Sequence, residues 1–397
     1  MPPVADLRAY TRTGGISLLY FDDDYAAARD VSALSLEGCD VAALVDRACA
    51  LAAARRLVFP EAEVLLERCV VALLSGHLIL QGPPGTGKTT LAAVLAETFG
   101  ATTQLETATA DWSTYDVIGG LHPTSRGGIE ALEPWLGHVP RAALQCASVV
   151  ARHADPDEPE PHQAHWLIID EFNRAEIDKA IGPLYTVLGG GDADNKLPLW
   201  FGDEHSGGAY VWIPKRFRII ATMNTVDANY VYTLSQGLSR RFQFIHVGVP
   251  DSARIDDELH QAATAAAEWY AATYGAAFDV TGFVADSAVA RATDVLRDML
   301  TTLRYDNDAT GQAGWPLGSA QLADVYRQLA VRMPTGPRDG DAVLRALDLA
   351  LADRVIPQAG NLTSAQLGAI EAWLKRAPLP RAALALRQLR SAAATGY

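Results

Sequence analysis

The chain has 397 residues, of which 49% are hydrophobic and 20% are charged, and its formal net charge is -14. This composition is typical of folded domains with a sizeable core and excludes a disordered or collagen-like chain. The acidic balance excludes a uniformly basic surface that coats nucleic acid, although it leaves room for a local basic pore or stripe. No apolar run reaches the ~18–20 residues that span a bilayer. The N-terminus does not resemble a secretory signal, and the four cysteines are too scattered for a disulfide framework. We therefore expect a cytoplasmic protein without membrane contact.

Residues 1–59 predict a short segment that packs on the domain after it. The run 16–21 is typical of a strand. Apolar residues then recur at helical spacing from Val41 to Ala52, with Asp40 as a plausible N-cap.

A second helix is predicted to begin at Pro60. The apolar run 77–80 predicts a buried parallel strand, and a glycine-rich loop and an alanine-rich helix to Phe99 follow it. Strand, glycine loop and helix in this order form half of a βαβ unit.

The middle of the chain has an irregular pattern of predicted elements, and the amino-acid composition changes after Pro250. Glycine pairs predict hairpin-like loops over 111–128, and the acidic, proline-rich residues 155–165 predict an exposed excursion. Further predicted elements are strands at 166–169, 211–213 and 217–221 and a helix at 177–188. An all-α region follows, with helices predicted at 252–274, 286–303, 318–332, 341–354, 364–375 and 379–392.

The glycine-rich loop matches the pattern G-x-x-x-x-G-K-[ST] and lies between a predicted strand and a predicted helix. Its glycines let successive backbone N–H groups point inward around an anion, and the helix N-terminus adds a positive end. Lys88 can reach the β- and γ-phosphates, and the Thr89 hydroxyl can bind Mg²⁺. The predicted nucleotide-binding residues are Gly82, Pro83, Pro84, Gly85, Thr86, Gly87, Lys88, Thr89 and Thr90.

Two further apolar strands end in polar residues. Asp170 and Glu171 follow one strand, and Asn224 ends another. Asp170 can hold Mg²⁺, Glu171 can polarise the attacking water as a general base, and Asn224 can orient that water. In isolation these would be a solvated strand end and a turn residue. Their order after the phosphate loop favours catalysis.

Arg240 and Arg241 stand directly before another apolar stretch. In isolation they would be a surface charge pair. Arginine can, however, reach a neighbouring subunit's γ-phosphate and stabilise charge in the transition state. With the preceding motifs, this role is favoured for at least one of the two.

Together these motifs resemble those of the AAA+ ATPases. Within them the sequence is similar to the branch of the McrB-type restriction motors, with MoxR-type and dynein-related ATPases as broader kin. The resemblance is carried by GPPGTGKTT at 82–90, DWSTYDVIGG at 111–120, IIDEFNRAEIDKAIGPLYTVL at 168–188, IPKRFRIIATMNT at 213–225 and LSRRFQF at 238–244. It implies an α/β nucleotide-binding domain with a parallel sheet over 60–250 and an all-α lid domain over 251–397.

The resemblance also implies roles for single residues. Lys88 and Thr89 would bind phosphate and Mg²⁺, Asp170 and Glu171 would be the acidic metal-binding and catalytic pair, and Asn224 would be the first sensor. Arg240 and Arg241 would act on the nucleotide of an adjacent subunit, which requires a homo-oligomeric ring, commonly of six. The loop 112–121 looks like the pore-facing insertion of such rings.

Two features depart from the family pattern. Gln321 stands where the lid of many AAA+ proteins carries an arginine, and Arg327 lies almost two turns further on. McrB-type proteins also join a DNA-reading domain to the N-terminal side, whereas only residues 1–59 precede the core here. We therefore expect a separate effector or adaptor protein to select the target.

Weaker features have more ordinary explanations. His153, His162 and His165 fit a solvated loop better than a metal site, and Trp200, Phe201 and Trp212 fit core or hairpin packing. The basic residues Lys215, Arg216 and Arg218 fit a solvated strand edge, with subunit or polymer contacts as the alternative.

The leading hypothesis is therefore a Mg²⁺-dependent NTP hydrolase, with ATP favoured over GTP. It would form a ring motor that remodels or translocates a partner protein or nucleic acid, and the nearest resemblance implies a restriction or antiviral defence system. One alternative is a MoxR-like chaperone for a protein partner. Another is a slowly hydrolysing, nucleotide-gated assembly scaffold.

Overall fold

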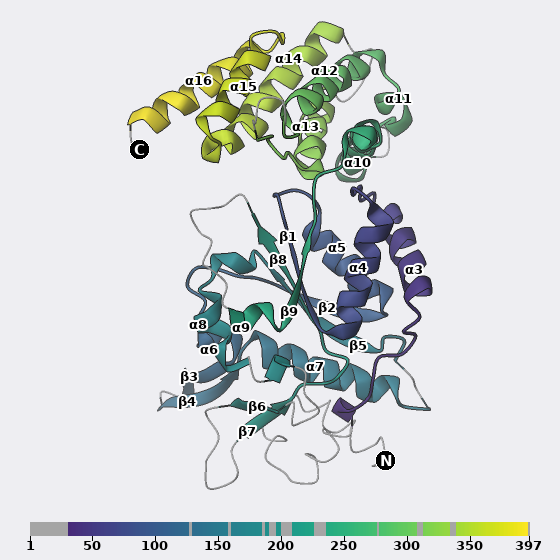
Figure 1. Ribbon diagram of the computed structural model, residues 1–397, viewed down its shortest axis with the longest axis vertical. Helices are drawn as coiled ribbons and strands as arrows, with labels where there is room; N and C mark the ends of the chain where they lie inside the picture. Colours follow the sequence, from purple (N-terminus) through teal and green to yellow (C-terminus); the bar gives the residue numbers. More distant parts are fainter. Residues whose placement is uncertain are drawn as a thin grey trace. The chain divides into compact units, whose positions relative to one another are not determined.

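The computed structural model describes residues 31–126, 129–157, 160–184, 187–189, 196–199, 209–225, 236–275, 278–307, 313–333 and 339–395. The chain divides into two units (Figure 1). The first unit comprises Met1–Arg55, Ala62–Gln81 and Lys88–His246, and the second comprises Arg56–Glu61, Gly82–Gly87 and Val247–Tyr397. The strand predicted at 16–21, Trp200 and Phe201 lie outside the described residues.

A five-stranded parallel sheet forms the centre of the first unit, with the strand order β2-β5-β8-β1-β9 (Figure 1). Its strands are β1 His77–Gly82, β2 Ala101–Thr107, β5 Ala164–Asp170, β8 Ile219–Asn224 and β9 Phe242–His246. β1 runs parallel to β9, β2 to β5, and β5 to β8. Every residue of β5 and β8 except the last is buried, so both faces of the sheet are covered. This burial explains why these strands are almost continuously apolar.

Helices of the first unit pack on this sheet. They are α3 Val41–Ala54, α4 Ala62–Ser75, α5 Lys88–Thr98 and α7 His138–His153. α5 contacts β2, β5 and β8, α7 contacts β5, and α3 contacts α4 and α5. The predicted N-cap of α3 is confirmed, because the Asp40 carboxylate accepts a hydrogen bond from the Ala43 N–H at 3.0 Å. β2 and α7 were not predicted from the sequence.

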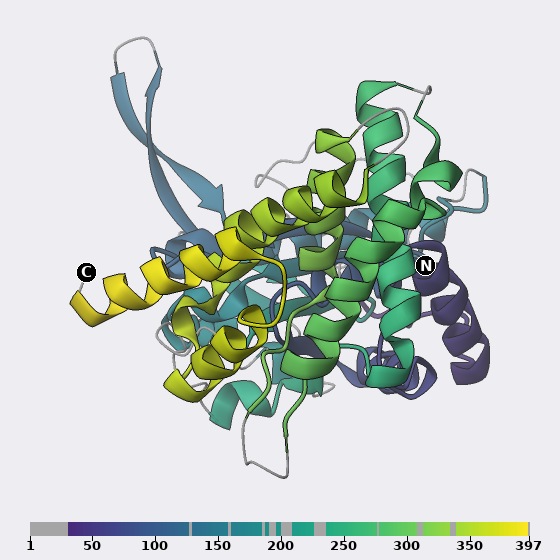
Figure 2. The same ribbon diagram turned by 90° about the horizontal axis from the view of Figure 1, so that it is seen from above.

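Two hairpins accompany the sheet. The short helix α6 Thr114–Val117 precedes the antiparallel strands β3 Gly119–Arg126 and β4 Ile129–Leu136, which form a long two-stranded ribbon (Figure 2). The second hairpin pairs β6 Lys196–Leu199 with β7 Ala209–Trp212. The glycine pairs thus correctly indicated a hairpin, although its second strand lies beyond the predicted loop.

The single helix predicted over 177–188 is wrong in part. The structure has α8 Ile177–Ile181, followed by the 3₁₀ turns η3 Gly182–Leu184 and η4 Val187–Gly189. Proline has no N–H to donate to the preceding turn, so an α-helix is not expected to continue regularly through position 183.

The expectation of a solvated edge at the basic residues after β7 is also wrong for Arg216, which is buried. Its guanidinium donates to the backbone carbonyls of Ser35 and Gln163 and to the Glu37 carboxylate, the last at 2.7 Å. A buried cation needs such partners. Arg216 therefore ties residues 35–37 to the chain just before β5.

The three histidines of the predicted loop do not converge. His153 contacts the Glu160 carbonyl and the Glu37 carboxylate, and His162 contacts the Glu160 carboxylate. His165 lies inside β5 instead of in the loop, and its Nδ1 is 2.8 Å from the Thr102 hydroxyl.

The second unit is built from helices, which confirms the predicted all-α region. They are α10 Ile255–Tyr274, α11 Val280–Val284, α12 Ser287–Leu303, α13 Ser319–Arg332, α14 Gly340–Ala350, α15 Ser364–Leu374 and α16 Pro380–Thr395, with a π-helical turn η7 Leu351–Val355 after α14. Their apolar faces form one core that includes Leu259, Leu296, Leu322, Tyr326 and Leu347. Within the described part of the chain, no helix is both long enough and apolar enough to cross a membrane.

An ion pair is buried in the second unit between α10 and the end of α12. The Arg304 guanidinium donates to both carboxylate oxygens of Glu258, at 2.5 and 2.9 Å, and both side chains are fully buried. The Ser319 hydroxyl at the start of α13 donates to the same carboxylate at 2.5 Å. The pair therefore joins three helices through one carboxylate.

We expect Arg304→Met to lower the free energy of unfolding by about 3–5 kcal/mol, because it leaves the Glu258 carboxylate buried without its cation. Arg297→Met is the matched control. It removes the same kind of side chain from exposed ion pairs with Asp256 and Asp294 and should cost less than about 1 kcal/mol. Urea unfolding followed by circular dichroism measures both. Equal losses of unfolding free energy in the two variants would show that the buried ion pair contributes no more to stability than the exposed ones.

Candidate functional site

Five polar side chains meet at the carboxyl edge of the parallel sheet. Lys88 and Thr89 come from the first turn of α5, Asp170 ends β5, Glu171 follows it, and Asn224 ends β8. The Lys88 ammonium donates to Asn224 Oδ1 at 2.9 Å, and Asn224 Nδ2 donates to Glu171 Oε1 at 2.7 Å. The Thr89 hydroxyl donates to Asp170 Oδ1 at 2.7 Å. Ligands of α/β sheets bind at this edge, so the cluster lies where a site is expected.

Lys88 is buried, although it begins a helix. Burial lowers the pKa of its ammonium to about 8, and the nearby carboxylates of Glu171 and Asp170 oppose part of that shift. The ammonium therefore loses its proton at a pH only slightly above neutral. A bound polyanion would favour its charged form.

Glu171 has an unusual backbone conformation. Its φ of 56° and ψ of 37° lie in the left-handed region, which is uncommon for residues other than glycine. Its N–H donates to the Thr222 hydroxyl at 3.2 Å, and that hydroxyl donates to Asp170 Oδ1. Arg174 Nε donates to Glu171 Oε2 at 3.2 Å. These contacts hold the carboxylate toward Asn224.

Thr222 and Arg174 were not among the predicted site residues. Arg174 belongs to the stretch 168–188, one of those that carry the family resemblance, so the sequence contained a signal for it. Thr222 gave none beyond its place near the end of a predicted strand.

Thr89 and Asp170 form the part of the cluster that fits a metal ion. Hydroxyl and carboxylate oxygens are the ligands that Mg²⁺ prefers, and Mg²⁺ is commonly bound by one or two protein groups together with substrate phosphates. Thr90, the last of the predicted loop residues, is exposed on the same turn of α5.

The glycine-rich loop itself belongs to the second unit. Gly85 and Gly87 have φ values of +75° and +82°, so both require the conformational freedom of glycine. A Cβ atom on Gly85 would lie 2.2 Å from Gln321 Oε1. The Thr86 hydroxyl donates to the Pro83 carbonyl at 3.0 Å and closes the turn.

Gln321 lies against this loop, at the position where the family pattern has an arginine. Its Nε2 donates to the Pro84 carbonyl at 3.3 Å and to Gln358 Oε1 at 3.0 Å. The guanidinium of Arg327 instead pairs with Asp324 at 2.9 Å and lies over the Trp269 ring. A neutral amide thus occupies the predicted place of the lid arginine.

The structure does not bring Arg240 and Arg241 to the cluster. They follow α9 Gln236–Ser239 and precede β9, whose first residue pairs with the first residue of β1. Lys88 comes after the opposite end of β1, so the arginines and the cluster lie at opposite edges of the sheet. The Arg241 guanidinium donates to the Gly237 carbonyl at 3.1 Å.

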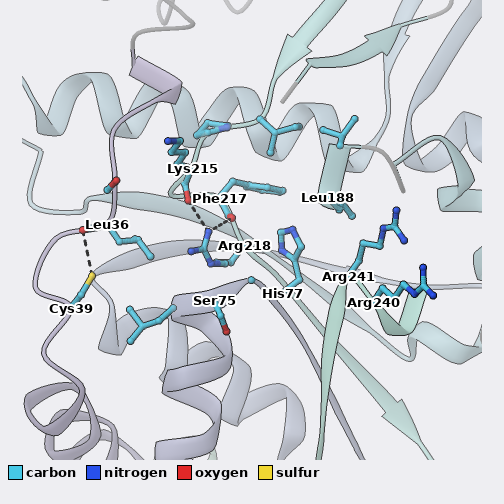
Figure 3. Close-up of a pocket in the computed structure, with 16 residues that line it drawn as sticks. Leu36, Cys39, Ser75, His77, Leu188, Lys215, Phe217, Arg218, Arg240 and Arg241 are labelled. Carbon is cyan, nitrogen blue, oxygen red and sulfur yellow. Dashed lines mark hydrogen bonds between the residues drawn. The ribbon is translucent and has the colours of Figure 1, made fainter. Parts of the chain in front are cut away.

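Both arginines line a pocket of about 560 Å³ at this amino edge (Figure 3). Lys215, Arg218 and His77 also line it, and among the described residues that form its lining none is acidic. Burial lowers the pKa of Arg218 to about 10 and that of His77 to about 3. His77 is therefore neutral near pH 7, and the positive charge of the pocket comes from Lys215, Arg218, Arg240 and Arg241.

Comparisons with known proteins agree with this geometry. Residues 77–242 match the family model described as the AAA domain of the dynein-related subfamily. The chaperone MoxR1 of Mycobacterium tuberculosis is 30% identical over 188 residues, which are 47% of this chain and 40% of that protein. The matched part thus spans less than half of the relative.

Solved structures of RuvB mutants from Thermotoga maritima are also similar. One has 15% identity and a TM-score of 0.37, covering 79% of this chain and 82% of that one. Another has 14% identity and a TM-score of 0.39, covering 79% and 81%. The family match and the MoxR relative both cover the part of the chain that holds the cluster, so this part is similar to the AAA domains of dynein-related and MoxR-type proteins.

Proposed function

We propose that this chain is a Mg²⁺-dependent, MoxR-like ATPase that works as a homo-oligomeric ring and remodels a partner protein. The observation that carries the proposal is the hydrogen-bonded series Lys88–Asn224–Glu171 beside the Thr89–Asp170 pair. These are the groups that a triphosphate, its metal ion and an attacking water require. In this proposal residues 60–250 are the nucleotide-binding domain and residues 251–397 are the lid.

Each group has a defined task in hydrolysis. The backbone of Gly82–Gly87 and the Lys88 ammonium bind the β- and γ-phosphates. Thr89 and Asp170 would hold Mg²⁺, which offsets phosphate charge when bound. Glu171 accepts a proton from the attacking water as that water bonds to the γ-phosphorus, and ADP leaves. The Asn224 amide orients the water and keeps Glu171 in place.

Arg240 and Arg241 would complete the site of a neighbouring copy. They lie at the opposite edge of the sheet from the cluster, in a pocket rich in positive charge. A guanidinium that cannot reach its own γ-phosphate can still stabilise the transition state of an adjacent subunit. This arrangement supports a ring, for which six copies is the common number.

The proposal of a protein partner rests on the comparisons and not on the geometry. The matched relative is named a chaperone, which supports a protein substrate over a specific restriction or antiviral role. Four further proposals have less support. They are a separate effector that selects the target, handling of nucleic acid through the pore, use of GTP and a cytoplasmic location.

Glu171→Gln should lower kcat for ATP at least about 100-fold, because the general base is lost, while ATP binding is retained. Glu176→Gln is the matched control, since Glu176 is exposed and its carboxylate forms an ion pair with Lys179 in the short helix α8 directly after it. Steady-state hydrolysis of ATP and GTP with Mg²⁺, together with equilibrium binding, tests this. Tight binding without any turnover of the unsubstituted protein would instead support the scaffold alternative.

Mixing two inactive variants should restore hydrolysis if the arginines act between copies. The double variant Arg240→Ala, Arg241→Ala keeps its own cluster, and Glu171→Gln keeps its arginines. In a mixed ring, the cluster of the first variant faces the arginines of the second. Activity measured against mixing ratio should peak near equal amounts. An additive, flat response would exclude action in trans.

ATP binding should weaken about tenfold between pH 7 and pH 9, because the pKa of Lys88 is lowered to about 8 in the free protein and phosphate favours its protonated form. Binding then takes up a proton above about pH 8. Calorimetry in buffers of different ionisation enthalpy measures this uptake. Lys88→Arg, which stays charged throughout, should lose the pH dependence even if its affinity is lower. A wild-type affinity that does not change with pH would contradict the assignment.

A further inference from the structure

Asn173 is a buried polar residue beside the cluster that the proposed mechanism does not use. It lies in the 3₁₀ turn η2 Phe172–Arg174, directly after Glu171, and its exposed fraction is 2%. Its Nδ2 donates to the backbone carbonyl of Asn224 at 3.1 Å. Its Oδ1 accepts from the backbone N–H of Asn224 at 3.4 Å. One carboxamide therefore binds both main-chain polar groups of the same residue.

These contacts occur where β8 has separated from β5. The last residue pair between the two strands joins Ile169 to Ala221, three residues before Asn224. A backbone N–H and C=O near the end of a strand need replacement partners when they are not exposed to water. A carboxamide offers one donor and one acceptor, as a neighbouring strand would. Asn173 thus continues the hydrogen bonding of the sheet for one more residue.

We propose that Asn173 is a positioning residue for ATP hydrolysis that acts through Asn224. By holding the Asn224 backbone, it fixes the direction of the side chain whose Oδ1 accepts from Lys88 and whose Nδ2 donates to Glu171. Asn173 also follows Glu171 in the chain, so it links the segment that carries the general base to the strand that carries the sensor. The inference depends on the proposed ATPase function.

A role in positioning predicts a specific kinetic pattern. Asn173→Leu keeps the branched shape of the side chain, although it is larger, and removes both hydrogen bonds. We expect kcat to fall about 10- to 100-fold, because small misplacements of reacting groups have large effects, while KM and ATP affinity change less than about threefold. Binding depends on the phosphate loop and Lys88, whereas the hydrogen bonds of the Asn173 side chain go to the Asn224 backbone.

A second variant separates positioning from general loss of fold. Asn173→Asp keeps the acceptor for the Asn224 N–H but places an unprotonated oxygen against the carbonyl. Protonation of this buried carboxyl group restores a donor. Its kcat relative to the unsubstituted protein should therefore rise as pH falls from 8 to 6. The pH profile of Asn173→Leu, which cannot be protonated, should run parallel to that of the unsubstituted protein.

Thr98→Val is the matched control for losing a buried hydrogen bond. The Thr98 hydroxyl donates to the Val94 carbonyl at 2.8 Å within α5, away from the cluster. This variant should keep kcat within about twofold of the unsubstituted protein, whatever its melting temperature.

The measurements are kcat, KM, ATP affinity and melting temperature of the full chain. The inference is overturned if folded Asn173→Leu and Asn173→Asp keep full kcat, or if kcat and ATP affinity fall together. If Asn173→Leu does not fold, the pH profile of Asn173→Asp decides alone. Absence of ATP turnover in the unsubstituted protein would overturn the proposed function itself and this inference with it, so the two failures are distinguishable.

Discussion

The carboxamide of Asn224 binds a cation with its oxygen and an anion with its nitrogen, and the candidate site depends on this double contact. Lys88 begins a helix, Glu171 follows one strand and Asn224 ends another, so no local interaction could align the three. The parallel sheet aligns them, because the carboxyl ends of its strands lie at one edge. The amide then separates two opposite charges that would otherwise pair directly.

The sequence was sufficient to predict the parallel α/β core, the phosphate loop and the helical region after Pro250. Each has a strong local signal, such as the apolar run of β5 or the helical spacing in α3. Asp170 and Asn224 could be found for the same reason, since each follows an apolar strand. The sequence could not reveal Thr222, because its hydroxyl matters only through a residue 52 positions away in the chain.

The failed expectations have a common physical origin. Arg216 looked like a surface cation, but the carbonyls of Ser35 and Gln163 and the Glu37 carboxylate, all distant in sequence, make its burial favourable. The helix over 177–188 looked regular by its apolar spacing, but Pro183 interrupts the backbone. The spacing of apolar residues indicates which face of a helix or strand is apolar. It does not indicate polar partners that come from distant parts of the sequence, and it does not take account of the N–H that proline lacks.

The left-handed backbone of Glu171 has a consequence for how this position can vary. A residue with a Cβ atom in this conformation costs about 1–2 kcal/mol relative to one without, and the bonds to Thr222 and Asn224 offset that strain. Glycine would relieve the strain but would remove the carboxylate. Selection for a stable fold therefore favours glycine at position 171, whereas selection for hydrolysis favours the carboxylate. A lineage that lost hydrolysis could accept glycine at this position.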